Sequence, residues 1–232
     1  MTPERFRRCK AVLARRQPDL TVLMDNVHKP HNLSAIVRSC DAVGIFDIHG
    51  VSRVKTIRTK KDITAGSGKW VNAHLHADLD SAAAVLKKQN MQILAAHPDE
   101  QALDFREVDY TKPTAILLGQ ELDGVTDEGL ALADQHIVIP MLGMVDSLNV
   151  SVAAALILFE AQRQRLAAGM YDQAHLEQST YANTLFEWSH PKMAAFYQSK
   201  GLPYPELDED GNILESEVHT HARLLTGISA KS

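Results

Sequence analysis

Three short polar segments of this sequence combine residue types that could carry out chemistry. The first covers residues 26–38 and reads NVHKPHNLSAIVR, with Asn32 and Arg38 six positions apart. A guanidinium in the turn between a strand and a helix can clamp a phosphate through two parallel hydrogen bonds. An ordinary helix cap at Asn32 and a surface arginine at Arg38 fit the pattern equally well, so the spacing alone leaves both interpretations open.

The second segment covers residues 117–125 and reads LLGQELDGV, so an apolar strand runs into Gly119 and the carboxylate of Glu121 follows. In open α/β sheets, ligands bind beyond the carboxyl ends of the strands. A glycine at that edge permits a ligand to approach the backbone closely. In the competing interpretation, Glu121 is a loop carboxylate that caps the helix expected after Thr126.

The third segment covers residues 137–151, where a strand ends at Pro140 and a loop leads into an apolar helix. Ser147, Asn149 and Ser151 stand at the beginning of that helix. Capping would account for such residues one at a time. Their density directly before an apolar helix favours a binding site, because each buried polar group needs a partner.

Common cofactor signatures are absent from the sequence. The only Gly-x-Gly covers residues 66–68, does not follow an expected strand, and has Val71 where a dinucleotide fingerprint needs glycine. There is no Walker A sequence, and the eleven histidines are scattered without metal-ligand spacing. Cys9 and Cys40 are isolated, as in proteins with reduced thiols. We therefore expect no metal.

The elements that position the three segments alternate along the chain. Short apolar strands separated by helical stretches predict a parallel sheet flanked by helices, an α/β fold. Thr2 is expected to cap the first helix, with Pro3 at its first position. We expect strands at 20–24, 46–51, 91–96, 114–119 and 136–140. Helices are expected at 2–16, at 32–43, from Asp80 or Ser81 to about 90, and from Ser147 or Asn149 to about 168. Residues 53–69 are expected to form a basic surface loop.

The sequence divides into three parts. A basic N-terminal helical extension covers residues 1–18, the α/β domain covers 19–170, and a C-terminal extension with a proline-rich acidic turn or linker covers 171–232. Within the α/β domain, residues 150–159 read VSVAAALILF and are apolar on all sides of a helix. Such a helix is expected to be buried all round, either deep in the domain or at a subunit interface.

Charge is distributed unevenly along the 232 residues. The formal net charge is −5, which argues against a nucleic-acid partner, yet residues 1–20 carry six basic and two acidic side chains. A basic arm on an acidic protein can still contact phosphates, although a solvated amphipathic helix would look the same. The longest apolar run is too short to span a bilayer, and no signal peptide is visible. We expect a cytoplasmic protein that binds no membrane.

In this order, the three segments resemble the three motifs of the SpoU-type methyltransferases of the SPOUT superfamily, and most closely the tRNA (guanosine-2′-O-)methyltransferases among them. The stretches that carry the resemblance are ARRQPDLTVLMDNVHKPHNLSAIVRSCDAVG, DFREVDYTKPTAILLGQELDGV and IPMLGMVDSLNVSVAAALILFEAQRQRLAAGMY. The resemblance covers roughly residues 1–171. It implies an α/β domain with a C-terminal deep trefoil knot, S-adenosylmethionine as cofactor, a homodimer with the active site beside the interface, and methylation of the guanosine ribose at position eighteen in the tRNA D-loop.

The resemblance also assigns roles to individual residues. Arg38 would be the main catalytic residue, and Leu122-Asp123 follows Glu121 where family members often have a lysine. The implied catalytic set is Asn32, Arg38, Glu121, Ser147 and Asn149, with the cofactor held near the backbone of Ala96, Gly119, Ile139, Met141 and Leu148, and RNA contacted by Arg8, Arg15, Arg16, His31, Arg163 and Arg165.

Two mechanisms for Arg38 remain open at this stage. As a general base it would have to lose its proton, which costs roughly 7 kcal/mol near neutral pH for a group with a pKa above about 12. As a cation it would clamp a substrate phosphate and place the hydroxyl. Asn32 is expected to orient Arg38 or the interface, while Glu121, Ser147 and Asn149 shape the cofactor loops.

Three alternative functions fit parts of this sequence. The same chemistry on a ribosomal RNA guanosine is the nearest, and the short basic N-terminal helix favours tRNA. A catalytically silent RNA-binding protein of this fold is the second, and the intact motif residues argue against it. A nucleotide-binding metabolic enzyme is the third, and it lacks a phosphate loop.

Overall fold

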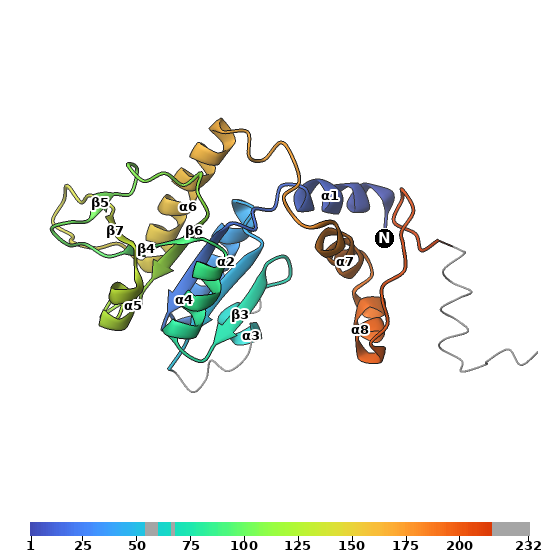
Figure 1. Cartoon of the computed structure of the whole chain (residues 1–232), viewed down its shortest axis with the longest axis horizontal. Helices are drawn as coiled ribbons and strands as arrows, with labels where there is room; N and C mark the ends of the chain where they lie inside the picture. Colours follow the sequence, from blue (N-terminus) through green and yellow to red (C-terminus); the bar gives the residue numbers. More distant parts are fainter. Residues whose placement is uncertain (54–59, 66–67, 215–232) are drawn as a thin grey trace, which may run out of the picture. The chain divides into compact units, whose positions relative to one another are not determined.

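The computed structural model describes residues 1–53, 60–65 and 68–214. The chain forms two compact units (Figure 1). One covers Arg16–Gln173, and the other combines Met1–Arg15 with the residues from Ala174 onward. Among the described helices, none is long and apolar enough to cross a membrane.

The larger unit is built on a seven-stranded sheet in the order β3-β2-β1-β6-β4-β7-β5. Every strand pair is parallel, so the loops that follow the strands all leave the sheet at one edge. Parallel sheets bind ligands at this edge. The strands are β1 Leu20–Asp25, β2 Asp47–Val51, β3 Asn72–His76, β4 Gln92–Ala96, β5 Leu103–Asp104, β6 Thr114–Leu118 and β7 Gln135–Val138.

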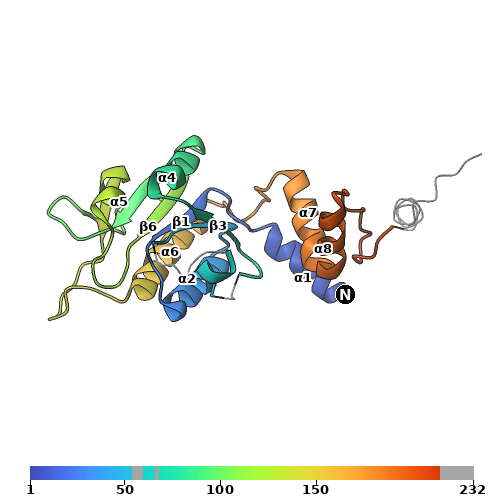
Figure 2. The same ribbon diagram turned by 90° about the horizontal axis from the view of Figure 1, so that it is seen from below.

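Helices cover both faces of the sheet, as predicted for an α/β fold. The helices α2 (Pro30–Ala42) and α6 (Val150–Ala167) pack against each other and against one face, where side chains such as Ile36, Ile116 and Ile157 form the main core. The helices α4 (Leu79–Lys88) and α5 (Asp127–Leu132) cover the opposite face (Figure 2). A short helix, α3 (Lys60–Ile63), packs beside β3.

Several element boundaries differ from those expected. The helix predicted from Asn32 begins at Pro30, with Lys29 as its N-cap residue, because a proline fits the first turn of a helix. Asp78 rather than Asp80 or Ser81 caps α4, by accepting a hydrogen bond from the Ser81 amide at 2.7 Å. The strands β3 and β5 were missed. Of the surface loop predicted at 53–69, residues 54–59 and 66–67 lie outside the described residues, and 60–63 form α3.

The helix α6 is not buried on all sides within the single chain, so it does not lie deep in the domain, and its burial at a subunit interface stays a prediction. Ala154, Ile157, Leu158 and Ala161 are buried, but Val152, Leu156 and Phe159 are 47%, 43% and 50% exposed. The exposed three are spaced four and three residues apart, so they form one stripe along the helix. A helix that is apolar all round therefore presents an apolar stripe to the outside of a single chain.

The smaller unit joins the two ends of the chain. The helices α1 (Pro3–Leu13), α7 (Gln178–Ser189) and α8 (Pro191–Lys200) form it, and Thr2 caps α1 as predicted. α1 packs against α7, and the Tyr181 hydroxyl donates to the Lys10 carbonyl at 3.2 Å. Phe186 stacks on Tyr204 with ring centroids 4.7 Å apart. The sequence pattern indicated two separate extensions, whereas in the structure the N-terminal helix and the helices after Gln173 belong to one compact unit.

Candidate active site

A cavity opens where β4 and β7 end, at the predicted ligand edge of the sheet. Its empty volume is about 500 Å³, with the open solvent at its mouth included. Four of the five residues expected to hold the cofactor line it: Ala96, Ile139, Met141 and Leu148. The loop between β7 and α6 and the first turns of α6 close it, so most of the lining is apolar. The remaining lining residues are His97, Pro98, Ile137, Val138, Asp146, Ser147, Ala153 and Ile157.

Gly119, the fifth expected residue, does not line this cavity, and its Cα lies close to the backbone of its own loop. A Cβ at this position would lie 2.0 Å from the Gly124 carbonyl carbon and 2.1 Å from the Val125 nitrogen. Gln120 and Gly124 exchange two backbone hydrogen bonds of 3.0 and 3.1 Å, which fold the loop back on itself. The absence of a side chain at Gly119 is therefore required by the chain's own backbone in the loop that carries Glu121.

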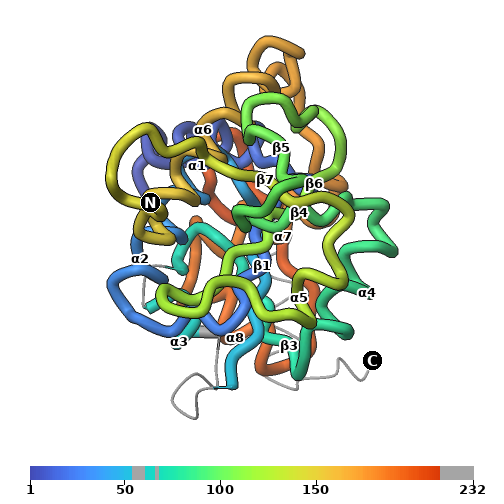
Figure 3. Tube along the Cα trace, turned by 90° about the vertical axis from the view of Figure 1, so that its left-hand side faces the viewer, coloured from blue at the N-terminus to red at the C-terminus, as the bar shows by residue number. Residues whose placement is uncertain are grey.

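The side-chain amide of Asn32 connects all three polar segments. Its Nδ2 donates to Glu121 Oε1, and its Oδ1 accepts from Asn149 Nδ2 at 3.2 Å. Asn149 Oδ1 in turn accepts from the amide and hydroxyl of Ser151 at 2.9 and 2.6 Å, which caps α6. Figure 3 shows the loops that follow β6 and β7 beside α2. One hydrogen-bonded chain thus holds both loops to the start of α2.

This network settles two of the open alternatives. Asn32 is 1% exposed and lies inside α2, so it is not an N-cap. Glu121 does not cap the following helix, because Thr126 does so by accepting from the Gly129 amide at 3.2 Å. Glu121 also lies 3.9 Å from Lys29 Nζ. Sequence reasoning missed Lys29 as a partner, although its position directly before Pro30 places it at the start of α2.

Ser147 and Arg38 lie outside this network. Ser147 lines the cavity and is exposed, with its hydroxyl 3.4 Å from Asp146 Oδ1. Arg38 is exposed on α2, six residues from Asn32, which at 100° per residue places the two side chains about 120° apart around the helix. Within the described part of the chain, no hydrogen bond or ion pair reaches the Arg38 guanidinium, so Asn32 does not orient it by contact.

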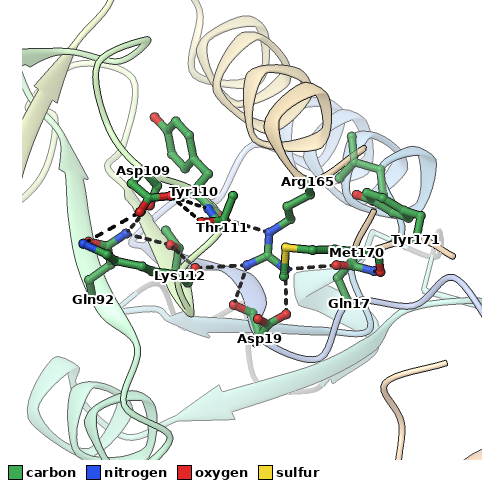
Figure 4. Close-up of polar contacts among 12 residues, drawn as sticks. Gln17, Asp19, Gln92, Asp109, Tyr110, Thr111, Lys112, Arg165, Met170 and Tyr171 are labelled. Carbon is green, nitrogen blue, oxygen red and sulfur yellow. Dashed lines mark hydrogen bonds and ion pairs between the residues drawn. The ribbon is translucent and has the colours of Figure 1, made fainter. Parts of the chain in front are cut away.

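Two of the six expected RNA contacts are buried in the protein, which corrects the sequence-based assignment. Arg165 is 0% exposed and binds Gln17 Oε1, Asp19 Oδ1 and the carbonyls of residues 19, 110 and 112 (Figure 4). Arg16 is also 0% exposed and binds Asp41 and the carbonyls of residues 41, 45 and 70. Their donors point inward, and neither is kept as an RNA contact. The burial of these two side chains could not be predicted, because buried and exposed arginines look alike in a helical pattern.

The other four expected RNA contacts are exposed. Arg8 and Arg15 belong to the helical unit, and His31 lies in the first turn of α2. Arg163 lies on α6 and pairs with Glu160 at 2.7 Å. All four side chains therefore lie at the protein surface.

Three histidines gather away from the cavity, at the β2–β3 edge of the sheet. His49 Nδ1 lies 2.9 Å from His76 Nε2, and His74 Nε2 lies 2.9 Å from Asp47 Oδ1. Burial, and then the neighbouring His74 and His76, lower the pKa of His49 to about 4. Among the residues that the structure describes, no group of three histidine, cysteine or acidic side chains is arranged to hold a metal ion.

The parallel sheet, the cavity at its carboxyl edge and the three joined segments fit the motif order of the SpoU-type methylases. The chain belongs to the SpoU rRNA methylase family, whose model matches residues 19–159, and the model of the SpoU rRNA methylase C-terminal region matches residues 163–216. The resemblance drawn from the three segments is therefore confirmed.

Particular relatives are more informative. The chain is 54% identical over 215 residues to the tRNA (guanosine(18)-2′-O)-methyltransferase of Escherichia coli (strain K12), covering 92% of this chain and 94% of the relative. It superposes on the crystal structure of the A. aeolicus TrmH/SpoU tRNA modifying enzyme with a TM-score of 0.74 and 43% identity, over 82% of this chain and 96% of that one. The SpoU methyltransferase AviRb from Streptomyces viridochromogenes, in complex with the cofactor AdoMet, gives a TM-score of 0.57 and 26% identity, over 66% and 62%.

Proposed function

We propose that this protein transfers a methyl group from S-adenosylmethionine to the ribose 2′-oxygen of guanosine 18 in tRNA. The observation that carries the proposal is the chain of hydrogen bonds from Glu121 through Asn32 to Asn149, which joins all three family motifs next to a cavity at the ligand edge of the sheet. Relatives that match most of this chain are named tRNA (guanosine(18)-2′-O)-methyltransferase.

The cavity fits the cofactor in chemistry. Its walls are mainly apolar, as an adenine ring and an aliphatic side chain require, and Asp146, Ser147 and His97 supply polar groups for the charged and hydroxyl-bearing parts. The cofactor would be held by Ala96, Ile139, Met141 and Leu148. Gly119 contributes indirectly, because it allows the loop that carries Glu121 to fold tightly. When bound, the cofactor supplies an electrophilic methyl group on a sulfonium.

Arg38 acts on the RNA as a cation. Its exposed guanidinium has five donors, and a bidentate contact to a phosphate next to the target ribose would hold the 2′-oxygen in line for attack. Removing a proton from an arginine would cost roughly 7 kcal/mol near neutral pH. A phosphate oxygen or a water molecule is therefore the better proton acceptor.

The active form is a homodimer in which α6 contributes to the interface. The stripe of Val152, Leu156 and Phe159 supports this, since apolar side chains in a row on a single chain mark an interaction surface. Leu142, Met144 and Val145, in the loop that closes the cavity, are also more than half exposed. Arg38 does not line the cavity of its own chain, so we propose that each cavity receives Arg38 from the partner.

The chain from β7 to α6 forms the trefoil knot that the resemblance implied. This part of the proposal is supported by the return of α6 to pack against α2 after the loop at 139–149 and by the TM-score of 0.74 with the A. aeolicus enzyme. A knot would hold the cavity loops in a fixed mutual arrangement, because none of them could be withdrawn without unthreading the chain.

tRNA is bound by the exposed basic residues Arg8, Arg15, His31 and Arg163. Arg8 belongs to α1, whose buried side is apolar and whose exposed side carries several cations. Contacts of this kind act through phosphates and supply affinity rather than sequence readout.

A ribosomal RNA guanosine is the second candidate substrate, because the matching family models are described as rRNA methylases. The test is incorporation of labelled methyl from S-adenosylmethionine into unmodified tRNA transcript and into ribosomal RNA fragments, with mapping of the product nucleoside. We expect 2′-O-methylguanosine at tRNA position 18. Methylation of ribosomal RNA alone would transfer the proposal to that substrate, and failure to bind the cofactor would favour a silent RNA-binding protein.

A further inference from the structure

A buried carboxylate without an assigned role lies at the ligand edge of the sheet. Asp25 is the last residue of β1, and it is 0% exposed. Its Oδ1 accepts from Asn26 Nδ2 at 2.6 Å, and its Oδ2 accepts from the Thr126 backbone amide at 2.8 Å. Burying a carboxylate is costly unless donors surround it, so Asp25 imposes a strict arrangement on the two groups that satisfy it.

The neighbouring Asn26 extends this arrangement to a third loop. Its backbone has a positive φ of 57°, which asparagine tolerates better than most residues, and its amide donates to the Val51 carbonyl at 3.0 Å. Its Oδ1 accepts from the Arg53 amide at 2.8 Å, which fixes the orientation of the side-chain amide. The pair Asp25-Asn26 therefore cross-links the chain after β1, β2 and β6.

The bond to Thr126 closes the loop that carries Glu121. This loop leaves β6 at Gly119, is folded by the paired hydrogen bonds between Gln120 and Gly124, and ends at Thr126 on the Asp25 carboxylate. Glu121, between these anchors, accepts the Asn32 amide, and Asn32 accepts the Asn149 amide beside the cavity. A shift of the loop end would reach the cavity through these three side chains.

We propose that Asp25 is a positioning residue of the cofactor site. Its carboxylate fixes the end of the 119–126 loop, the loop fixes Glu121, and Glu121 fixes the amide chain that holds the start of α6. Asp25 itself touches neither cofactor nor RNA. The inference rests on the proposed function only in naming the cofactor, since the hydrogen-bonded chain exists independently of it.

The first test is Asp25→Asn. This variant keeps the shape of the side chain, but its NH₂ group must face another hydrogen-bond donor, either Asn26 Nδ2 or the Thr126 amide. We expect binding of S-adenosylmethionine and S-adenosylhomocysteine, measured by calorimetry, to weaken by about tenfold, in line with the loss of one hydrogen bond to a charged group. The control is Asp134→Asn, because the exposed Asp134 accepts the Ile93 amide on Oδ2 at 2.8 Å just before β7 begins, at the sheet edge opposite to the Glu121 loop. We expect no change in cofactor affinity for this control.

The second test separates positioning from general stability. Cofactor affinity is measured for Asp25→Asn, Glu121→Gln and the double variant. If Asp25 acts through Glu121, the double variant binds about as weakly as the weaker single variant. Fully additive losses, or a weakened affinity in the Asp134→Asn control, would overturn the proposal.

A third test applies even if Asp25→Asn fails to fold. Thr126 has a φ of −68°, which proline can adopt. Thr126→Pro removes the donor to Asp25 and the hydroxyl cap and sets the ring Cδ against the carboxylate, whereas Thr126→Ala removes the cap alone. We expect faster amide hydrogen exchange across 119–125 in the proline variant than in the alanine variant. Equal exchange in the two would contradict the proposal. This readout needs no cofactor, and it stays valid if the wild-type protein binds none and the proposed function fails.

Discussion

Asn149 Nδ2 donates a hydrogen bond of 3.2 Å to Asn32 Oδ1, joining side chains 117 positions apart in the sequence. Both ends of the Asn32 amide are engaged, because its Nδ2 donates to Glu121. An amide is the appropriate group here, since one end must accept from an amide and the other must donate to a carboxylate. The start of the helix after the cavity is thereby tied to the loop after β6.

Asn32→Asp should disrupt this junction more severely than Asn32→Ala. The aspartate would place a second carboxylate against Glu121 in a site that is 1% exposed, and like charges at such a distance repel strongly. We expect cofactor affinity, measured by calorimetry, to fall further in Asn32→Asp. If Glu121→Gln added to Asn32→Asp restores part of the affinity, the repulsion is identified as the cause, and an Asn32→Asp variant that binds like Asn32→Ala would refute it.

Arg38→Lys should lose most of the methyl transfer activity. A lysine keeps the charge but cannot make two parallel hydrogen bonds to a phosphate, and misplacement of the reacting hydroxyl costs roughly 100-fold in rate. The measurement is single-turnover transfer to tRNA, with cofactor binding as the control that should not change. Near-normal activity would exclude any need for the guanidinium geometry.

Mixing variants tests whether Arg38 acts on the partner's cavity. Arg38→Ala and Ile139→Trp, which fills the cavity, should each be inactive alone. If Arg38 acts in the partner's cavity, mixed dimers contain one intact site and regain part of the activity. If it acts in its own chain, the mixture stays inactive.

Arg165→Ala should affect stability, whereas Arg163→Ala should affect tRNA binding. Arg165 is 0% exposed and ion-paired with the half-buried Asp19 at 2.6 Å. Its removal leaves Asp19 and the carbonyls of residues 19, 110 and 112 without their donor, and should lower the free energy of unfolding by about 3–5 kcal/mol. Arg163 is exposed, so its removal should leave the unfolding free energy nearly unchanged and weaken tRNA binding. Denaturant unfolding and filter binding measure the two effects, and equal unfolding free energies for both variants would contradict the burial argument.

The basic side of α1 should determine the salt dependence of tRNA binding. Removing Arg7, Arg8 and Arg15 together releases fewer counterions on binding, so the slope of log affinity against log salt should become shallower. A matched control replaces the exposed Lys87 and Lys88 at the end of α4. An unchanged slope in the triple variant would remove α1 from the RNA-binding surface.

Mild acid should destabilise the larger unit through His49. The pKa of His49 is lowered to about 4 in the fold by burial and by His74 and His76, against about 6.5 in the unfolded chain. The unfolded chain therefore binds the proton more readily, and stability is lost as pH falls from about 6.5 toward 4. We expect a loss of about 2 kcal/mol between pH 7.5 and 5 in denaturant unfolding. In His49→Gln this loss should shrink, whereas in the exposed-site control His31→Gln it should persist.

The sequence by itself determined the class of fold and the location of the chemistry. Alternation of short apolar strands with helices predicted the parallel sheet, since the periods of apolar residues follow from local geometry. The three polar segments could be placed beyond strand ends from their neighbours alone. Boundaries were less well determined. Asn32 was expected to begin a helix that Pro30 begins, and the strand β3 was missed because its alternating histidines do not form an apolar pattern.

Only the tertiary structure decided what each polar side chain binds. Nothing local distinguishes Arg163 from Arg165, yet one is exposed and the other is 0% exposed among carbonyls that arrive from the loops before β1 and β6. The same holds for Asn32, whose partners are 89 and 117 positions away, and for Asp25, whose acceptor role depends on an amide 101 positions away. Burial and partnership are properties of contacts between distant segments, so a local pattern does not contain them.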